Sequence, residues 1–194
     1  LTYTLLLISR QMKKDLGKIH IYTGNGKGKS TAGLGLAIRA LGYDLKVGII
    51  YFDKGGDIYN ERKILDILKE KYSEKLVYQA FGTQRMIEGK EFRFENLPED
   101  LTEAKKALTA TGEWFKQAFD LIILDELNTT VKTELLKIEN ILPIIKAKPE
   151  KLELVLTGRY CPAELLDLAD LVTEMTEVKH YSHNGVMARP GIDY

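Results

Sequence analysis

Short apolar runs alternate along the chain with longer segments in which apolar residues recur at helical spacing. The run LKVGIIYF at residues 45–52 is apolar at nearly every position, as is typical of a strand buried on both faces of a parallel sheet. In the longer segments, apolar residues return every three or four positions, which indicates one buried helical face. The pattern predicts strands at residues 19–22, 45–52, 76–80, 121–125 and 152–156, and helices at 29–42, 60–72, 100–119, 134–146 and 162–170. This alternation predicts an α/β fold with a mostly parallel sheet flanked by helices.

Residues 81–98 form a long polar connection without a clear helical or strand pattern. Connections of this length inside a compact domain are usually functional or mobile. Phe81, Phe92 and Phe94 either present an aromatic surface to a flat ligand or pack onto the core, and the sequence leaves both interpretations open. Further on, Pro143 is expected to bend or interrupt its helix. An extended stretch at 171–178 then leads into an irregular tail.

The length of 194 residues suits one α/β domain with a substantial core. We expect this domain to span residues 18–194, after an N-terminal extension at 1–17. Met12 resembles a natural start, so residues 1–11 are an upstream extension or a leftover of expression, and an N-terminal helix that packs on a partner is the alternative. The apolar run at 4–8 is too short to span a bilayer and lacks the cleavage site of a secretory signal, which predicts no membrane partner.

Charge and cysteine content narrow the function classes. Lys and Arg together number 28, as do Asp and Glu, so no global basic field favours nucleic acid and a small ligand is expected. The single cysteine, Cys161, excludes an internal disulfide and a cysteine-rich metal site, and it fits a reducing cytoplasm. His180 and His183 stand three residues apart, but the nearby Gly185 and Pro190 disfavour a helical zinc site.

The segment TGNGKGKST follows the first strand and opens the first helix. It is similar to the P-loop pattern G-x-x-x-x-G-K-[ST], in which backbone N–H groups cradle phosphates, a lysine reaches the outer phosphates and a hydroxyl binds Mg²⁺. Thr23 stands where the pattern has its first glycine, so the loop is a variant. The predicted nucleotide-binding residues are Thr23, Gly24, Asn25, Gly26, Lys27, Gly28, Lys29, Ser30 and Thr31.

Two later strands end in residues that suit the same site. Asp125 and Glu126 close the strand at 121–125, which we expect to lie beside the first strand so that the carboxylates hold Mg²⁺ or its waters. The strand at 152–156 runs into Arg159, whose guanidinium either binds phosphate oxygens in a bidentate manner or lies on the surface of a turn. The candidate catalytic residues are Lys29, Glu126 and Arg159, and the candidate metal ligands are Ser30, Asp125 and Glu126.

Together these motifs resemble the P-loop family of ATP:corrinoid adenosyltransferases. The matching pieces are TGNGKGKST, FDKG at 52–55, NER at 60–62, LDEL at 124–127, LTGR at 156–159 and the tail TEMTEVKH…GVMARPGIDY at 173–194. A P-loop alone occurs in many enzymes, whereas the tail with VKH and the terminal GIDY is particular to this family. The resemblance covers nearly the whole chain from residue 18 onward.

The resemblance implies a RecA-like P-loop NTP-binding fold, a homodimer, and two substrates, MgATP or MnATP and a reduced corrinoid. It also implies that Co(I) attacks the ribose C5′ of ATP, bound in reverse along the P-loop, and that triphosphate is released. The reaction would serve adenosylcobalamin synthesis or salvage, with an electron-donating flavoprotein reductase as a partner. Because Co(I) is itself a strong nucleophile, the protein has to position C5′ and neutralise the leaving group, a task that suits Lys29, Ser30, Glu126 and Arg159.

The resemblance is weakest in the long connection. Better-known members carry a GFTWET-like cluster there, associated with holding the corrinoid in a four-coordinate, reducible state, whereas this chain has AFGTQRM, with Phe81 but no tryptophan. Phe81, Phe92 and Phe94 are the candidate corrinoid contacts. Two other functions stay open at this point: a P-loop kinase or ATPase that releases ADP, and a nucleotide-binding regulator without turnover.

Overall fold

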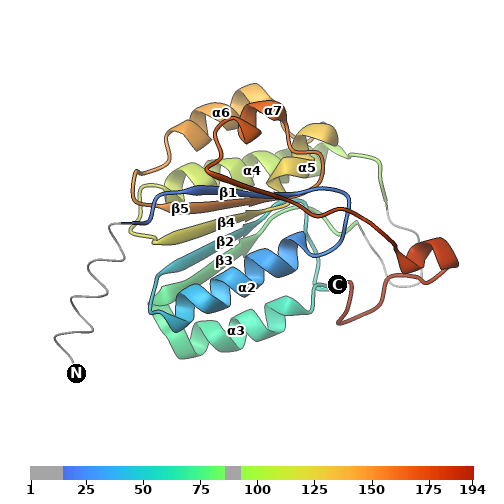
Figure 1. Ribbon diagram of the computed structural model, residues 1–194, viewed down its shortest axis with the longest axis horizontal. Helices are drawn as coiled ribbons and strands as arrows, with labels where there is room; N and C mark the ends of the chain where they lie inside the picture. The colour runs from blue at the N-terminus through green and yellow to red at the C-terminus, as the bar shows by residue number, and fades with distance from the viewer. Residues whose placement is uncertain (1–14, 86–92) are drawn as a thin grey trace.

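A computed structural model describes residues 15–85 and 93–194, and a sheet of six strands forms its centre (Figure 1). All neighbouring strands in this sheet run parallel, in the order β3-β2-β4-β5-β1-β6. The strands are β1 Ile19–Thr23, β2 Val47–Tyr51, β3 Leu76–Ala80, β4 Leu121–Asp125, β5 Glu153–Thr157 and β6 Leu171–Glu174. Their carboxyl ends meet at one edge of the sheet, which is where open α/β folds bind ligands.

Helices cover both faces of the sheet. They are α2 Lys29–Gly42, α3 Glu61–Tyr72, α4 Pro98–Trp114, α5 Leu127–Lys132, α6 Ile138–Lys146 and α7 Ala163–Leu166, with short 3-10 turns η1 Ser73–Lys75 and η2 Tyr181–Asn184. Helices α2 and α3 lie on one face, and α4 to α7 lie on the other (Figure 1). Successive strand residues point to opposite faces, so that Ile122 and Leu124 of β4 join one core while Leu121 and Ile123 join the other. The predicted α/β class and its parallel sheet are confirmed.

Strand β4 does not lie beside β1 as predicted, because β5 is inserted between them. Asp125 at the end of β4 nevertheless reaches Ser30 at the start of α2, because α2 packs across β4 as well as β1. Gly33 permits this close approach. A Cβ there would already lie 3.4 Å from Ile123 Cγ2 on β4, so any larger side chain would push α2 away from the sheet.

The helix predicted at 134–146 begins later than expected, at Ile138, and a separate short helix, α5, which the pattern did not predict, precedes it. Glu134 adopts a φ of 58°, and the N–H groups of Leu135 and Leu136 bond to Thr130 O, which turns the chain between α5 and α6. Pro143 lies inside α6 without ending it. Helix α4 begins at Pro98, two residues earlier than predicted, and the Asp100 carboxylate in its first turn accepts the Leu97 N–H at 2.8 Å. Within the described ranges, no helix is long and apolar enough to cross a membrane.

Candidate active site

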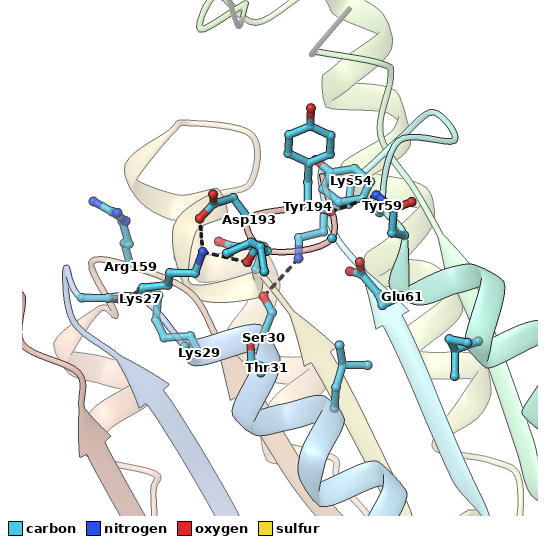
Figure 2. A pocket seen from close by; sticks show the side chains of 18 of the residues that line it. Lys27, Lys29, Ser30, Thr31, Lys54, Tyr59, Glu61, Arg159, Asp193 and Tyr194 are labelled. Carbon is cyan, nitrogen blue, oxygen red and sulfur yellow. Dashed lines mark hydrogen bonds and ion pairs between the residues drawn. The ribbon is translucent and has the colours of Figure 1, made fainter. Parts of the chain in front are cut away.

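A cavity of about 680 Å³ opens at the carboxyl edge of the sheet (Figure 2). Its volume falls in the range of about 300–1,000 Å³ that is usual for small-molecule sites. The P-loop, the start of α3, the ends of β4 and β5, and the tail all contribute walls. The lining includes Gly26, Lys27, Gly28, Lys29, Ser30, Thr31, Lys54, Tyr59, Asn60, Glu61, Glu126, Arg159, His180, Ile192, Asp193 and Tyr194.

The nine predicted P-loop residues divide into two groups. Residues 26–31 line the cavity, whereas Thr23, Gly24 and Asn25 pack against the chain that follows β5 and β6. Thr23 Oγ1 accepts the Cys161 N–H at 3.3 Å, and Asn25 Oδ1 accepts the Glu177 N–H at 3.0 Å. At Gly24, a Cβ would lie 2.4 Å from the Met175 carbonyl oxygen, and φ is 96°, so this position requires glycine. The first half of the loop is therefore an anchor, and the second half faces the ligand space.

Lys29 begins α2 and is buried at the base of the cavity. Its Nζ donates to the Gly26 carbonyl oxygen at 2.6 Å, so the side chain folds back over its own loop. Burial lowers the pKa of Lys29, with Glu126 opposing the shift and Arg159 adding to it. The lysine thus lies where a phosphate group wrapped by the loop would meet it.

Ser30 and Asp125 come together in the same place, as predicted. Ser30 Oγ donates to Asp125 Oδ2 at 3.1 Å, and the other carboxylate oxygen, Oδ1, accepts the Thr157 hydroxyl at 2.6 Å. A third group, which the sequence did not single out, joins them: Lys54 Nζ lies 2.6 Å from Asp125 Oδ2 and 3.0 Å from Ser30 Oγ. Burial alone would lower the pKa of Lys54, but Asp125 and Glu126 outweigh it and raise that pKa. The ammonium of Lys54 is therefore held beside two oxygen atoms that are candidate metal ligands.

Glu126 and Arg159 also face the cavity. Glu126 has a φ of 64°, and its N–H donates to Thr157 Oγ1 at 3.0 Å, which turns the chain sharply from β4 into α5. Thr129 then links the two candidate residues, because its hydroxyl donates to Glu126 Oε2 at 2.6 Å and accepts the Arg159 N–H at 3.0 Å. The Arg159 side chain itself is exposed at the rim.

The tail closes one side of the cavity through Lys27. The Lys27 ammonium pairs with the Asp193 carboxylate (Figure 2). It also donates to Ile192 O at 2.8 Å and to Tyr181 OH at 3.0 Å. On the opposite wall, Asn60 Nδ2 donates to Tyr194 O at 2.9 Å. The tail sequence GIDY and the triplet NER, which contributed to the resemblance without assigned roles, therefore meet at the cavity.

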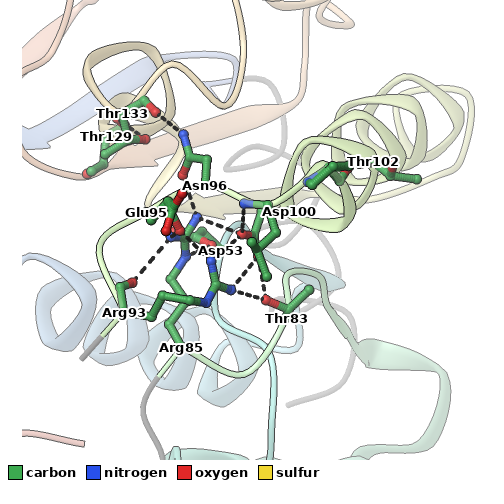
Figure 3. A network of polar contacts seen from close by, with 12 residues as sticks. Asp53, Thr83, Arg85, Arg93, Glu95, Asn96, Asp100, Thr102, Thr129 and Thr133 are labelled. Carbon is green, nitrogen blue, oxygen red and sulfur yellow. Dashed lines mark hydrogen bonds and ion pairs between the residues drawn. The ribbon is translucent and has the colours of Figure 1, made fainter. Parts of the chain in front are cut away.

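A second cavity of about 290 Å³ shares Lys54, Tyr59 and Glu126 with the first. Its outer wall includes Arg85, Phe94 and Asn96 from the described part of the connection after β3, where a cluster of charged side chains joins residues 81–85 to 93–100 (Figure 3). Arg85, only 5% exposed, donates to Asp53 Oδ1 at 2.6 Å and to Asn96 Oδ1 at 2.8 Å. Arg93 donates to both oxygens of Asp100, at 2.6 and 3.0 Å. No sequence motif pointed to this cluster.

The three phenylalanines of the connection differ in position. Phe81 is half-buried against the core and lines neither cavity, and its N–H and C=O bond to Tyr51 and Lys54. Phe94 is 86% exposed and lines the second cavity. Phe92 lies outside the described residues. The geometry therefore favours core packing for Phe81 and leaves Phe94 as the candidate contact.

His180 and His183 do not share a ligand position. His180 Nδ1 contacts Ser182 Oγ at 2.6 Å, and His183 Nε2 contacts Glu177 Oε1 at 2.7 Å. Over residues 15–85 and 93–194, no group of three or more His, Cys, Asp or Glu side chains is arranged to hold a metal ion. The donor set at Ser30, Asp125 and Glu126 instead fits Mg²⁺, which commonly takes one or two carboxylates and completes its shell with phosphates and water.

Comparison with known proteins identifies the family. The model of the family described as ATP:corrinoid adenosyltransferase BtuR/CobO/CobP matches residues 15–194. The chain belongs to this family. A corrinoid adenosyltransferase of Escherichia coli is 34% identical over 95% of this chain and 89% of its own length, and one of Salmonella typhimurium, CobA, is 35% identical over the same shares. A corrinoid adenosyltransferase of Pseudomonas aeruginosa is 31% identical over 95% of this chain and 87% of its own.

Among solved structures, the fold of this ATP:corrinoid adenosyltransferase is similar to that of the flagellar accessory protein FlaH from Methanocaldococcus jannaschii. The TM-score is 0.54 at 15% identity, over 82% of this chain and 71% of that one. Identity this low supports the fold alone. The predicted family and the RecA-like P-loop fold are confirmed.

Proposed function

We propose that this adenosyltransferase moves the 5′-deoxyadenosyl group of ATP onto the Co(I) centre of a corrinoid. In this reaction the electron pair of Co(I) forms a bond to C5′, the C5′–O bond breaks, and its electrons leave with triphosphate. The observation that carries the proposal is the grouping of Lys29, Ser30 and Glu126 at one cavity, with Asp125 hydrogen-bonded to Ser30, in a chain of this family. No side-chain nucleophile is required, because the metal centre of the substrate attacks.

The chain's own contribution is charge stabilisation and positioning. The leaving triphosphate carries several negative charges, and Lys29, the loop amides from Gly26 onward and Arg159 are the groups that would neutralise them. Preorganised donors aimed at developing charge are usually the largest single contribution to such a rate enhancement. We further propose that Ser30, Asp125 and Glu126 hold Mg²⁺ or Mn²⁺, whose chemistry is to neutralise phosphate oxygens.

The second cavity is the proposed corrinoid side. It adjoins the first through Lys54, Tyr59 and Glu126, so a ligand there would approach the nucleotide directly. Phe94 supplies exposed aromatic surface at this cavity, which suits the broad, partly apolar face of a corrin. The proposal also includes a homodimer, a flavoprotein reductase that supplies the electron, and a location in the cytoplasm.

One incubation tests the reaction. The protein is mixed with ATP, Mg²⁺ and chemically reduced cobalamin, and the Co–C chromophore and the phosphorus products are followed together. We expect one triphosphate for each Co–C bond. Release of ADP would indicate a kinase or ATPase instead, and ATP binding without any product would indicate a regulator. Omission of Mg²⁺ in the presence of a chelator should abolish the signal, and undiminished transfer would rule out the proposed metal requirement.

A further inference from the structure

The side chain of Lys54 occupies the place between the two oxygens that are the nearest candidate metal ligands. Its Nζ lies 2.6 Å from Asp125 Oδ2 and 3.0 Å from Ser30 Oγ, and those two oxygens are themselves 3.1 Å apart. Both partners are nearly enclosed, since the side chain of Lys54 is 12% exposed and that of Asp125 is 3% exposed. A divalent cation held by Ser30 and Asp125 would have to take the position that the ammonium now fills.

The backbone that carries Lys54 is held from three directions. The Arg62 guanidinium donates to the carbonyl oxygens of Lys54 and Gly56, the latter at 2.6 Å. The preceding residue, Asp53, is fixed by Arg85, and the Lys54 N–H donates to Phe81 O at 2.9 Å. With the backbone clamped in this way, only the flexible four-carbon side chain of Lys54 is free to move.

Aromatic rings and cavity space also border the ammonium where it lies now. Lys54 lines both cavities, so its side chain borders the space that the nucleotide would fill. The ring centroids of Tyr59 and Tyr51 lie 5.4 and 5.5 Å from Nζ, and aromatic faces at this range attract a cation. An ammonium that left Asp125 would therefore remain close to these rings and would enter the space in which the phosphates are proposed to bind.

We propose that Lys54 is an internal counter-ion that exchanges with the divalent metal. Without nucleotide, its ammonium neutralises Asp125 and keeps bare metal ions from Ser30 and Asp125. When metal and nucleotide bind together, the Lys54 ammonium leaves these oxygens and pairs with the triphosphate. The negative charge of the triphosphate then replaces the Asp125 carboxylate as the partner of the ammonium. The exchange makes metal and nucleotide bind cooperatively. Metal alone leaves the displaced ammonium without a partner, and nucleotide alone leaves part of its negative charge without one.

This inference rests on the proposed metal site, and its consequence is measurable without turnover. Mn²⁺ is titrated against the protein and followed by electron paramagnetic resonance, with and without ATP and with no corrinoid. In Lys54→Met, which keeps the apolar stem and removes the charge, we expect nucleotide-free Mn²⁺ to bind at least about tenfold more tightly, as expected when a competing cation is removed. The additional tightening caused by ATP should shrink by a similar factor.

Lys75→Met is the matched control. Lys75 also pairs with an aspartate, Asp44, but at the amino end of β3 and away from both cavities. Its loss should leave Mn²⁺ affinity unchanged, which separates local competition from a general effect of net charge. Lys54→Gln provides a second test if the methionine variant does not fold, and circular dichroism checks each variant before titration.

The outcomes separate the two proposals. If wild-type protein shows no ATP-dependent Mn²⁺ binding, or if Asp125→Asn leaves that binding unchanged, the metal site itself is misplaced. If wild-type binding depends on ATP and Asp125 but folded Lys54 variants bind Mn²⁺ no more tightly than wild type, Lys54 is only a structural ion pair. In steady state, the exchange also predicts a lower kcat in Lys54→Met together with a lower Mg²⁺ requirement, a combination that simple loss of stability does not produce.

Discussion

The two walls of the ligand space are built in different ways. The P-loop wall is made of backbone, with glycines that allow close approach and only one fully buried charged side chain, Lys29. The wall after β3 is made of side chains, with Arg85 and Asp100 buried and Arg93 and Asp53 bonded to them. A backbone cradle can be recognised from a short motif, because its geometry is local. A charge cluster that joins residues far apart in the sequence can be recognised only once the chain is folded.

This difference gives the two walls different vulnerabilities. The P-loop wall should lose function without losing the fold, because its key groups face the ligand. Substitutions in the connection wall should lower stability before they affect function, because removing one member of a buried charge cluster leaves the other charges uncompensated. In the described part of the connection, this charge cluster holds residues 81–85 and 93–97 together.

The largest expected effect is on the stability of the connection wall. Arg85→Met leaves the carboxylates of Asp53 and Asp100 with fewer partners, and we expect it to lower the free energy of unfolding by about 3–5 kcal/mol. Urea denaturation followed by circular dichroism measures this change. Arg39→Met, an exposed arginine on α2, serves as the control and should stay within about 0.5 kcal/mol of wild type. If the two variants are equally stable, the cluster does not support the wall.

Acid should loosen the same wall. The hydrogen bond from Arg93 holds the pKa of Asp100 well below its usual range. The resulting stability is complete above the unfolded pKa of about 3.9 and is lost as pH falls through the lower folded value. Burial raises the pKa of Asp53, which acts in the opposite direction, so Asp100→Asn is used to isolate Asp100. Urea midpoints between pH 6 and pH 3 should fall more steeply in wild type than in the variant. If the urea midpoints of wild type and Asp100→Asn fall equally with pH, Asp100 is not the source of the acid sensitivity.

The P-loop wall should respond in activity. Lys29→Ala removes the buried ammonium that would meet the triphosphate, and we expect adenosyl transfer to fall on the order of a hundredfold or more. The circular dichroism spectrum should be unchanged. Lys105→Ala, an exposed residue on α4, should transfer at the wild-type rate. Near-wild-type turnover by Lys29→Ala would place the triphosphate elsewhere.

Phe81 and Phe94 form a matched pair within one connection. Phe81 packs against the core, so Phe81→Ala should lower the free energy of unfolding by about 1.5–3 kcal/mol. Phe94 is exposed at the second cavity, so Phe94→Ala should raise KM for the corrinoid without changing KM for ATP or stability. Michaelis constants for both substrates and urea denaturation are measured on both variants. A raised KM for the corrinoid in Phe81→Ala, with no such change in Phe94→Ala, would instead indicate Phe81 as the corrinoid contact.

The smallest effect is expected at the tail. The pair between Lys27 and Asp193 is partly exposed, with Lys27 at 40%, and exposed ion pairs typically contribute about 0.2–1 kcal/mol. Lys27→Met should therefore hardly change the urea midpoint, but it should free the tail beside the cavity and increase proteolytic cleavage near residue 190 in the absence of ATP. If protease sensitivity stays the same, the other contacts of the tail are sufficient to hold it.

Features that depend on short-range pattern could be predicted from the amino-acid sequence. Continuous apolar runs indicated strands buried on both faces, and TGNGKGKST placed a phosphate cradle between a strand and a helix, with Lys29 and Ser30 where the structure has them. The acidic pair at Asp125 and Glu126 followed from its position at a strand end. These features are readable because each is set by backbone geometry within a few residues.

The meetings between residues far apart in the sequence depend instead on how the whole chain folds. Strand β5 lies between β1 and β4, and Ser30 at the start of α2 nevertheless contacts Asp125 at the end of β4. Lys54 joins them from the end of β2, and the tail reaches Lys27 from more than 150 residues away. Contacts of this kind depend on how helices and strands pack. A residue such as Arg85 has no local pattern that distinguishes a buried clamp from a solvated surface charge.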